Sequence, residues 1–223
     1  MKNQPVKIKS ISHNTQDVLH IVTEKPNGID FTPGQATEIF IDKEDWLNEG
    51  RPFSFICLPK DDYLEFMIKT YPSHEGVTNK LLDLKAGDGL ILNDVFGAIA
   101  YKGEGTFIAG GAGVTPFISI LRDLRAKNKL GNNKLIFANK TKKDIILEDE
   151  FRDMLGKNFI NILSEEETER YDNGHISEDF IKKNAASLNS NFYVCGPPAM
   201  MDAMEEQLDN LKVDKKKIIT EEF

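Results

Sequence analysis

Four consecutive residues, Arg51-Pro52-Phe53-Ser54, bring three chemically useful groups together in this chain. The Arg51 guanidinium matches a pyrophosphate in a bidentate manner. The Phe53 ring can cover a flat ring system, and the Ser54 hydroxyl can donate a hydrogen bond to a ring nitrogen. The alternative is an arginine placed before a strand with alternating core positions.

A second run, Gly110-Gly111-Ala112-Gly113-Val114-Thr115-Pro116, follows an expected strand and opens an expected helix. Glycines there let the backbone approach a pyrophosphate, and the helix N-terminus supplies partial positive charge. Pro116 occupies the third glycine position of the motif G-x-G-x-x-G, so the run departs from the generic dinucleotide motif. The alternative is a glycine-rich turn that serves packing only.

The third run, Cys195-Gly196-Pro197-Pro198, stands at the carboxyl end of another expected strand. Ligands bind at this end of the strands in open α/β sheets. A buried cysteine is otherwise a small apolar side chain, and this is the interpretation of Cys57, which has no such context.

Before Gly103, short segments rich in β-branched residues alternate with turns. Strands are expected at residues 6–11, 18–23, 38–41, 53–57, 63–69 and 89–92, and a short helix at 78–84. Six strands that close on themselves predict an antiparallel six-stranded β-barrel with one capping helix, in a domain of residues 1–102.

After Gly103 strands alternate with helices, which predicts an α/β domain of residues 103–223 with a parallel sheet covered on both faces. Strands are expected at 106–109, 135–138, 158–163, 191–195 and 218–220. Helices are expected at 115–127, with Thr115 as cap and Pro116 in the first turn, and at 147–155 and 177–184. The last helix carries Met200, Met204, Leu208 and Leu211 on one face.

The order and spacing of the three runs resemble the ferredoxin-NADP reductase superfamily, whose members pass electrons from a reduced nicotinamide through FAD. Arg51-Pro52-Phe53-Ser54 matches the family motif Arg-x-Tyr/Phe-Ser/Thr, and the glycine run matches Gly-Gly-x-Gly-Val-Thr-Pro. The matching motifs run from about Arg51 to the C-terminus. The resemblance implies FAD in the first domain and a nicotinamide dinucleotide in the second.

Further segments resemble the flavin-binding parts of the family. Ile68-Lys69-Thr70-Tyr71 is similar to the segment along the flavin, and Gly76-Val77-Thr78 to a second phosphate-binding element, although Thr78 also suits an ordinary helix cap. The ending Glu221-Glu222-Phe223 resembles the family's Glu-x-Tyr or Glu-x-Phe, with a frayed tail as the alternative. The implied FAD contacts are Arg51, Pro52, Phe53, Ser54, Ile68, Lys69, Tyr71, Gly76, Val77, Thr78 and Phe223.

In the second domain, the resemblance puts Cys195 beside the nicotinamide carbon that gives up hydride. The implied dinucleotide contacts are Gly111, Gly113, Val114, Thr115, Pro116, Asn139, Ser164, Cys195, Gly196 and Pro197. Ser54, Cys195 and Glu221 are the expected catalytic residues. Ser54 would stabilise developing charge, whereas Cys195 and Glu221 would fix geometry rather than act as nucleophile and base.

The choice between NADH and NADPH depends on the residues after the third strand of the second domain. Family members that select the 2′-phosphate carry a Ser-Arg pair there, and this chain has Ser164-Glu165 followed by two more glutamates. The carboxylates would repel a 2′-phosphate, so NADH is expected. Residues 137–141 also resemble NADH-cytochrome reductases. The alternatives are positive charge from Lys140, Lys142, Lys143 and Arg170, or a solvated loop.

Composition limits the other possibilities. A net charge of −8 argues against nucleic acid as a partner. Two cysteines far apart indicate a reducing cytoplasm rather than a disulfide framework, and neither the iron–sulfur spacing C-x4-C-x2-C nor a metal-ligand histidine spacing occurs. The longest uncharged run is too short to span a membrane, and no apolar signal region follows the first residues.

The expected function is an FAD-dependent NAD(P)H oxidoreductase, which passes electrons to a ferredoxin, a flavodoxin or a cytochrome-type acceptor. A free-flavin or ferric reductase is one alternative. An electron-transfer subunit without independent turnover is another, and a degenerate nucleotide-binding redox sensor is a third.

Overall fold

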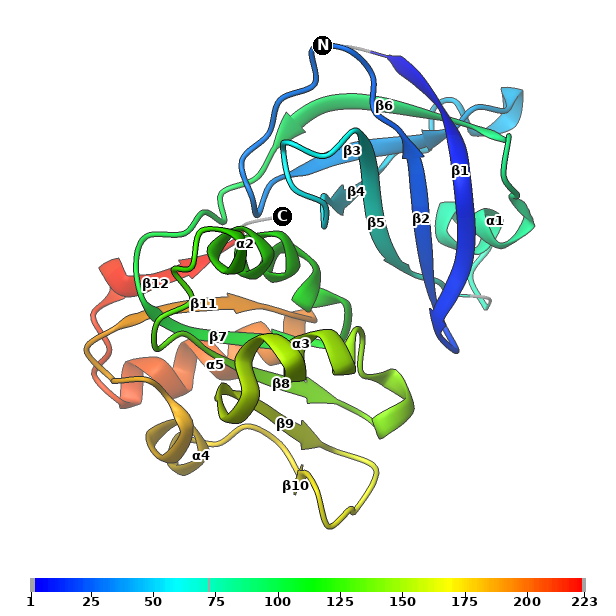
Figure 1. Cartoon of the computed structure of the whole chain (residues 1–223). Helices are drawn as coiled ribbons and strands as arrows, with labels where there is room; N and C mark the ends of the chain where they lie inside the picture. The colour runs from blue at the N-terminus through cyan, green and yellow to red at the C-terminus, as the bar shows by residue number, and fades with distance from the viewer. Residues whose placement is uncertain (1–2, 72, 222–223) are drawn as a thin grey trace. The chain divides into compact units, whose positions relative to one another are not determined.

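The computed structural model describes residues 3–71 and 73–221, and the chain divides into two compact units. The first unit comprises Met1–Ala100 and Thr115–Asp123, and the second comprises Tyr101–Val114 and Leu124–Phe223. The predicted class is confirmed: an antiparallel six-stranded sheet is followed by a parallel six-stranded sheet with helices (Figure 1). The domain boundary after residue 102 stays a prediction.

The first unit is built on one antiparallel sheet with the strand order β4-β3-β6-β1-β2-β5. Its strands are β1 (Gln4–Thr15), β2 (Val18–Glu24), β3 (Ala36–Ile41), β4 (Arg51–Ser54), β5 (Tyr63–Lys69) and β6 (Gly89–Phe96). The end strands β4 and β5 approach each other, because the Ile56 N–H just after β4 donates to the Glu65 carbonyl oxygen at 2.9 Å. This contact brings the two edges of the sheet together, as a barrel requires.

Apolar side chains from every strand except β4 fill the interior of this unit, and partly buried Phe53 of β4 packs against them. Inside it, the Phe31 and Phe55 rings stack with their centroids 4.2 Å apart. The predicted capping helix is present as α1 (Val77–Lys80) and the 3-10 turn Leu81–Asp83, which bury Val77 and Leu81 in the same core. A second 3-10 turn covers Glu44–Trp46.

The second unit is built on a parallel sheet with the strand order β10-β9-β8-β7-β11-β12. The strands are β7 (Gly105–Gly110), β8 (Lys134–Asn139), β9 (Phe159–Leu163), β10 (Asp172–Asn173), β11 (Asn191–Cys195) and β12 (Ile218–Thr220). Its helices are α3 (Glu148–Leu155), α4 (Glu178–Asn184) and α5 (Pro198–Asn210), with 3-10 turns at Gly111–Val114, Lys142–Asp144, Gly156–Asn158 and Lys215–Lys217. Helix α2 (Thr115–Ala126) follows the first of these turns, and only its residues 124–126 belong to this unit. Only the two-residue strand β10 and the 3-10 turns were not expected.

Helices cover both faces of the parallel sheet, as the sequence predicts. On one face, the Phe151 ring of α3 meets the Phe137 ring of β8 edge-on at 6.3 Å. On the other face, Ile181 of α4 and Met204 and Leu208 of α5 pack into one cluster with the strands. The central strand β7 pairs with β8 on one side and with β11 on the other, so the carboxyl ends of these three strands meet at one edge.

The greater part of α2, residues 115–123, belongs to the barrel unit and is hydrogen-bonded to it. The Gly34 N–H donates to Ser119 Oγ at 3.0 Å, and Arg122 Nη1 donates to the Ile56 carbonyl at 2.9 Å and to Glu65 Oε2 at 2.6 Å. His20 Nε2 lies 2.7 Å from the other oxygen of the Glu65 carboxylate. Burial alone would raise the pKa of Glu65, but the His20 hydrogen bond and the Arg122 guanidinium hold it below its usual value.

Neither a bilayer-crossing helix nor a metal-binding cluster occurs in the part of the chain that the structure describes. No helix there combines the length and the apolar character that a bilayer crossing requires. No group of three or more His, Cys, Asp or Glu side chains among the described residues is arranged to hold a metal ion. Cys57 and Cys195 are both free and buried.

Candidate active site

The Arg51-Pro52-Phe53-Ser54 run forms strand β4 at an edge of the first sheet. Ser54 pairs with Ala36 of β3 and Arg51 pairs with Ile39, so the run has a fixed register. Pro52 lacks an N–H and is tolerated because an edge strand needs donors on one side only. Phe53 is half-buried against the core, and Ser54 is half-buried as well.

The Arg51 side chain is exposed and only lightly engaged. Its Nη1 donates to the carbonyl of Gly50 at 2.7 Å, and its Nη2 lies 3.4 Å from an exposed carboxylate oxygen of Glu49. A guanidinium has five N–H donors, so the group keeps donors for an external anion. An exposed ion pair of this kind contributes little stability and is readily exchanged for a phosphate.

The segment after β5 presents a mixture of buried and exposed groups. The Ile68 side chain is buried in the barrel core, so only its backbone could reach a ligand. Lys69 forms an ion pair with Asp17 at 2.7 Å, whereas the exposed Tyr71 ring stacks on His74 with the centroids 5.7 Å apart. Nothing lies within 4 Å of the position that a side chain would take at Gly76.

Thr78 and Val77 both lie inside α1 rather than at its cap. The N-cap position is Gly76, so the ordinary capping role considered for Thr78 is wrong. Val77 is part of the barrel core. Phe223 is outside the described residues, and its flavin contact stays a prediction.

The structure brings the second and third runs together at the carboxyl edge of the parallel sheet. Cys195 pairs with Ala109, so the glycine run after β7 and the Gly-Pro-Pro turn after β11 are neighbours. A side chain at Gly110 would collide with Met200 and Pro197, and one at Gly113 would collide with the Cys195 carbonyl. The contact with backbone requires glycine at Gly113, whereas at Gly110 a side chain would displace Met200.

Gly111 is the one member of the glycine run that faces open space. Its φ of +51° lies in the left-handed region, and nothing stands within 4 Å of where its side chain would be. It begins the 3-10 turn Gly111–Val114, and α2 starts directly afterwards at Thr115. Val114, Thr115 and Pro116 are buried, so their backbone rather than their side chains would meet a ligand.

Three polar groups, of which Asn139 and Cys195 are buried and Glu221 is partly buried, lie at or just after the carboxyl ends of three strands of this sheet. Asn139 ends β8 with 7% exposure, and neither its Oδ1 nor its Nδ2 has a hydrogen-bond partner among the described residues. Glu221 lies one residue after β12, and its Oε1 also has no hydrogen-bond partner among the described residues. Burial raises the pKa of the Glu221 carboxyl group. Burial, and then the Glu221 carboxylate, raise the pKa of the Cys195 thiol to about 12, so it is neutral near pH 7.

An ion pair and a hydrogen bond join the charged loop after β9 to the residues that follow β8. The Lys140 ammonium lies 2.9 Å from Glu165 Oε1, and the Lys142 N–H donates to Glu166 Oε2 at 2.6 Å. Ser164, half-buried, donates its N–H to the Asn139 carbonyl and so extends the β8–β9 pairing. Lys140, which the sequence left available for a 2′-phosphate, therefore has a carboxylate beside it, in an exposed ion pair.

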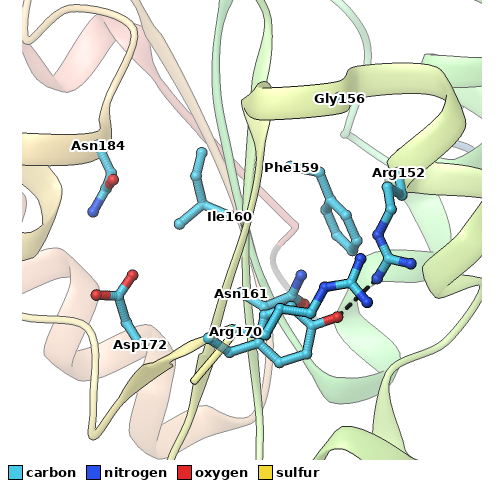
Figure 2. Close-up of a pocket in the computed structure, with 9 residues that line it drawn as sticks. Arg152, Gly156, Phe159, Ile160, Asn161, Arg170, Asp172 and Asn184 are labelled. Carbon is cyan, nitrogen blue, oxygen red and sulfur yellow. Dashed lines mark hydrogen bonds between the residues drawn. The ribbon is translucent and has the colours of Figure 1, made fainter. Parts of the chain in front are cut away.

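A cavity of about 370 Å³ lies elsewhere in the second unit, at the edge of β9 (Figure 2). Of the residues singled out from the sequence, its lining contains Arg170, which was one of the alternative sources of positive charge for a 2′-phosphate. The sequence did not predict this cavity. Its lining residue Asn161 lies within the otherwise apolar run Phe-Ile-Asn-Ile-Leu, which indicates a buried strand and nothing more.

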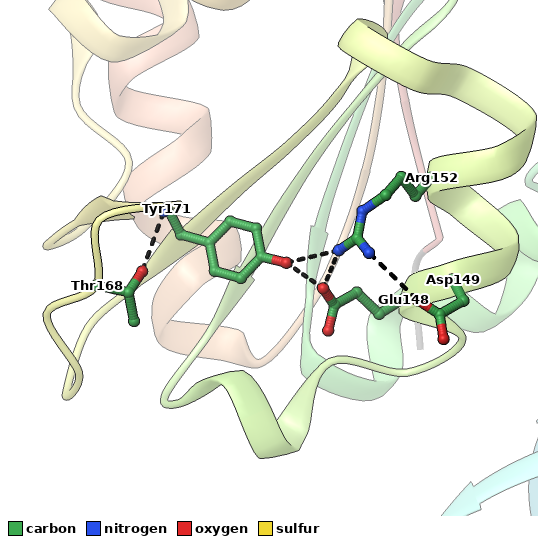
Figure 3. Close-up of polar contacts among 5 residues, drawn as sticks. All are labelled: Glu148, Asp149, Arg152, Thr168 and Tyr171. Carbon is green, nitrogen blue, oxygen red and sulfur yellow. Dashed lines mark hydrogen bonds and ion pairs between the residues drawn. The ribbon is translucent and has the colours of Figure 1, made fainter.

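A polar clamp next to this cavity ties the charged loop to α3 (Figure 3). The Tyr171 hydroxyl donates to Glu148, and Arg152 Nη2 donates both to Glu148 and, at 2.8 Å, to the Tyr171 oxygen. Burial would raise the pKa of Glu148, but the Tyr171 and Arg152 hydrogen bonds hold it low. Sequence reasoning missed this clamp, since its members gain meaning only when the loop folds back on the helix.

The residues present fit the two groups that the motifs imply. An open guanidinium at Arg51 and an uncrowded backbone at Gly76 suit the phosphates of FAD. The open left-handed turn at Gly111 and the unpaired Asn139 amide suit a dinucleotide, because they leave hydrogen-bonding capacity that the described part of the protein does not use.

Comparison with known families and proteins agrees with this division of the chain. A family model described as an FAD-binding domain matches residues 3–88, and one described as an oxidoreductase NAD-binding domain matches residues 107–206. The reductase component of a propane 2-monooxygenase from Mycolicibacterium goodii is 29% identical, over 97% of this chain and 66% of its own length. NADH-cytochrome b5 reductase 2 from Mycosarcoma maydis is 28% identical, over 88% of this chain and 62% of its own length.

A solved structure shares the fold. The FAD/NAD-binding domain of a nitric oxide dioxygenase from Vibrio cholerae superposes with a TM-score of 0.89 at 22% identity, covering 100% of this chain and 99% of that one. The class is thus an oxidoreductase with an FAD-binding domain followed by an NAD-binding domain. In its two domain families and their order this chain resembles the ferredoxin-NADP reductase superfamily, as its three runs indicated. It spans less than two thirds of the length of the two reductase relatives named above.

Proposed function

We propose that this chain is an NADH-dependent flavoprotein reductase that passes electrons singly to a separate acceptor. The observation that carries the proposal is the carboxyl edge of the parallel sheet. There the open turn at Gly111, the unpaired amide of Asn139 and the neutral thiol of Cys195 lie at the ends of adjacent strands. When bound, FAD supplies the chemistry that joins the two-electron donor to a one-electron acceptor.

On the flavin side, each residue has a binding or orienting role. The Arg51 guanidinium would hold the pyrophosphate, helped by the backbone around Gly76 and the Thr78 hydroxyl. Phe53 and Tyr71 offer aromatic surfaces to the ring system. The Ser54 hydroxyl would donate a hydrogen bond to the ring nitrogen and stabilise the charge that develops there.

On the nicotinamide side, the backbone N–H groups from Gly111 to Thr115 would receive the pyrophosphate. The Asn139 amide would hydrogen-bond a ribose or phosphate oxygen, which would satisfy its unpaired Nδ2. Cys195, with a pKa raised to about 12, would pack beside the nicotinamide as a neutral group. Glu221, whose Oε1 has no hydrogen-bond partner among the described residues, would help to fix the geometry of the site.

Selection of NADH follows from the loop after β9. Glu165 forms an exposed ion pair with Lys140, and Glu166 adds a further carboxylate near Ser164. A 2′-phosphate would have to compete with these carboxylates for cations. The name of the cytochrome b5 reductase relative supports the same donor.

The acceptor is a separate electron-transfer protein in this proposal, such as a ferredoxin, a flavodoxin or a cytochrome.

A specific finding also favours a second candidate, an electron-transfer subunit that needs its partner for turnover. The propane 2-monooxygenase relative is named as a reductase component, and this chain spans only 66% of it. The two free thiols suit the cytoplasm, which is the compartment we propose.

Anaerobic stopped-flow mixing of the flavin-loaded protein with NADH and with NADPH tests the proposal. We expect NADH to bleach the flavin absorbance at least about tenfold faster than NADPH. A tenfold difference in rate corresponds to about 1.4 kcal/mol of activation free energy. Equal rates would contradict the assigned donor. Bound flavin that neither nucleotide bleaches would contradict the reductase and favour the partner-dependent subunit.

A further inference from the structure

Helix α2 is bonded to the barrel unit along one of its faces. Ser119 and Arg122 lie about one helical turn apart, so their side chains leave the helix on the same side. The Ser119 hydroxyl accepts from the Gly34 N–H at 3.0 Å. The Arg122 guanidinium donates to the Ile56 carbonyl at 2.9 Å and to the Glu65 carboxylate at 2.6 Å. All of these residues belong to the barrel unit.

The contact at Gly34 leaves little room for adjustment. Gly34 has a φ of +101°, and a side chain there would collide with the Ile99 carbonyl and stand 3.0 Å from the Ile120 side chain of the helix. Ser119 is fully buried, and its hydroxyl donates to the Pro116 carbonyl at 3.3 Å. Consecutive hydrogen bonds therefore connect a barrel loop to the first turn of α2.

The ion pair between Arg122 and Glu65 gives the contact a direction. The two side chains are 20% and 10% exposed, and His20 Nε2 holds the carboxylate from its other oxygen at 2.7 Å. Apolar side chains of similar volume would bind a helix to a barrel about as firmly as a buried ion pair does, but they could slide past one another. Hydrogen bonds from one guanidinium to a carboxylate and a backbone carbonyl instead fix the rotation and the axial position of the helix.

The start of α2 is the part of the helix that bears on function. Helix α2 begins at Thr115, directly after the glycine turn Gly111–Val114, whose N–H groups would receive the pyrophosphate of the nicotinamide dinucleotide. The glycine turn belongs to the second unit and Thr115 to the barrel unit. The peptide bond between Val114 and Thr115 thus joins the proposed pyrophosphate site to a helix that the barrel holds.

We propose that Arg122 and Ser119 are positioning residues for hydride transfer. By fixing α2 on the flavin-binding barrel, they fix the place where the dinucleotide pyrophosphate binds, and with it the geometry in which the nicotinamide reaches the flavin. Each acts through the helix rather than by contact with the reactants. The inference rests on the proposed function, because it requires the pyrophosphate at the start of α2.

The test is anaerobic stopped flow on flavin-loaded Arg122→Gln. Bleaching of the flavin is followed over a range of NADH concentrations, which separates the limiting rate of reduction from the dissociation constant of NADH. We expect the limiting rate to fall at least about tenfold, because a misplacement of about 1 Å can cost about a hundredfold in rate. The dissociation constant should change less than about threefold, because the residues that bind the dinucleotide are all retained.

A second hydride donor distinguishes positioning from damage to the flavin site. N-benzyl-dihydronicotinamide carries the reacting ring but no phosphate, so the start of α2 does not hold it. We expect this donor to reduce the flavin of Arg122→Gln within about twofold of the wild-type rate, whereas a distorted flavin site would slow both donors alike.

Further variants locate the effect. Ser119→Ala removes the acceptor of the Gly34 N–H and should slow reduction by NADH about threefold or more, as the loss of one neutral hydrogen bond would. Glu65→Gln should act as Arg122→Gln does, and the double variant should be no slower than the slower single one, because both changes remove the same contact. Arg125→Gln is the matched control, since this guanidinium of the same helix pairs with Asp153 at the same 2.6 Å but is exposed, and it should change nothing.

All variants are compared at a temperature where Trp46 fluorescence and flavin content show them folded and loaded, and Ser119→Ala decides if Arg122→Gln does not fold. Wild-type protein that NADH does not reduce would refute the proposed function and, with it, this inference. A wild type that NADH reduces, beside variants with the same limiting rate, overturns the positioning role alone. Equal slowing of both donors also overturns it, because the change would then lie in the flavin site.

Discussion

The carboxylate of Glu65 gives the sharpest test of how the barrel unit is held together. Glu65→Gln preserves the shape of the side chain and an oxygen that accepts from Arg122, but it removes the charge. The side chains of Glu65 and Arg122 are 10% and 20% exposed, with 2.6 Å between the paired atoms. His20 would also lose its anionic partner at 2.7 Å.

The expected loss follows from this burial. Deleting one partner of a fully buried ion pair costs about 3–5 kcal/mol, whereas an exposed pair contributes about 0–1 kcal/mol. Because the substituted amide would keep a neutral hydrogen bond, we expect about 2–3 kcal/mol, or a melting temperature lower by about 5–10 °C. The pair Arg125–Asp153 has the same 2.6 Å distance but is 49% and 69% exposed, so Asp153→Asn is the matched control and should change nothing measurable.

The assay uses the chain's single tryptophan. Trp46 packs against the barrel core, so its fluorescence reports unfolding of that unit alone. Since the pKa of Glu65 is lowered in the folded state, its contribution is complete above the unfolded pKa of about 4.3 and is lost as the pH falls through the folded pKa. A variant that melts within about 1 °C of wild type at pH 7, or a difference that persists unchanged in acid, would contradict this account, since each kcal/mol corresponds to about 2–4 °C.

Three further outcomes are expected at the site. Ser54→Ala should slow reduction of the bound flavin by NADH about tenfold or more in stopped flow, without loss of FAD; an unchanged rate removes Ser54 from the mechanism. Glu165→Gln frees Lys140 and should raise the NADPH-to-NADH ratio of kcat/KM by about tenfold, and a ratio that stays fixed would mean that this loop does not select the donor. Because the pKa of Cys195 is about 12, iodoacetamide should leave this thiol unmodified for hours at pH 7, as mass spectrometry would report, and rapid alkylation would show a thiolate.

The strands of the second unit were predictable because they are buried on both faces. Residues 191–195 form an almost unbroken apolar run, and the predicted bounds agree with β11. Strand β10 was missed because Asp172 and Asn173 are polar and pair only through the neighbouring strand. Local sequence carries no signal for such a contact.

The parts of the site also differ in whether they depend on local sequence or on contacts between distant segments. The glycine run after β7 could be found from sequence, since its backbone requirement is local. The Glu65–Arg122 pair could not, because it depends on a barrel strand meeting a helix 57 residues later. Asn161 was read only as part of a strand, since its unpaired amide becomes visible only when its neighbours are placed. The contacts of Phe223, which lies outside the described residues, stay predictions.

The pairing of β7 with β11 also bears on when the dinucleotide loop takes its shape. Tyr193 donates its hydroxyl hydrogen to the Gly103 carbonyl across 90 residues of sequence, so this contact can form only after Tyr193 has been synthesised. Closing so long a segment is slow and entropically costly. The glycine turn that packs under the Cys195 carbonyl is therefore assembled late, only after the ribosome has released β11. A ribosome-stalled chain that ends before β11 would therefore contain the glycine run without the Cys195 carbonyl against which Gly113 packs.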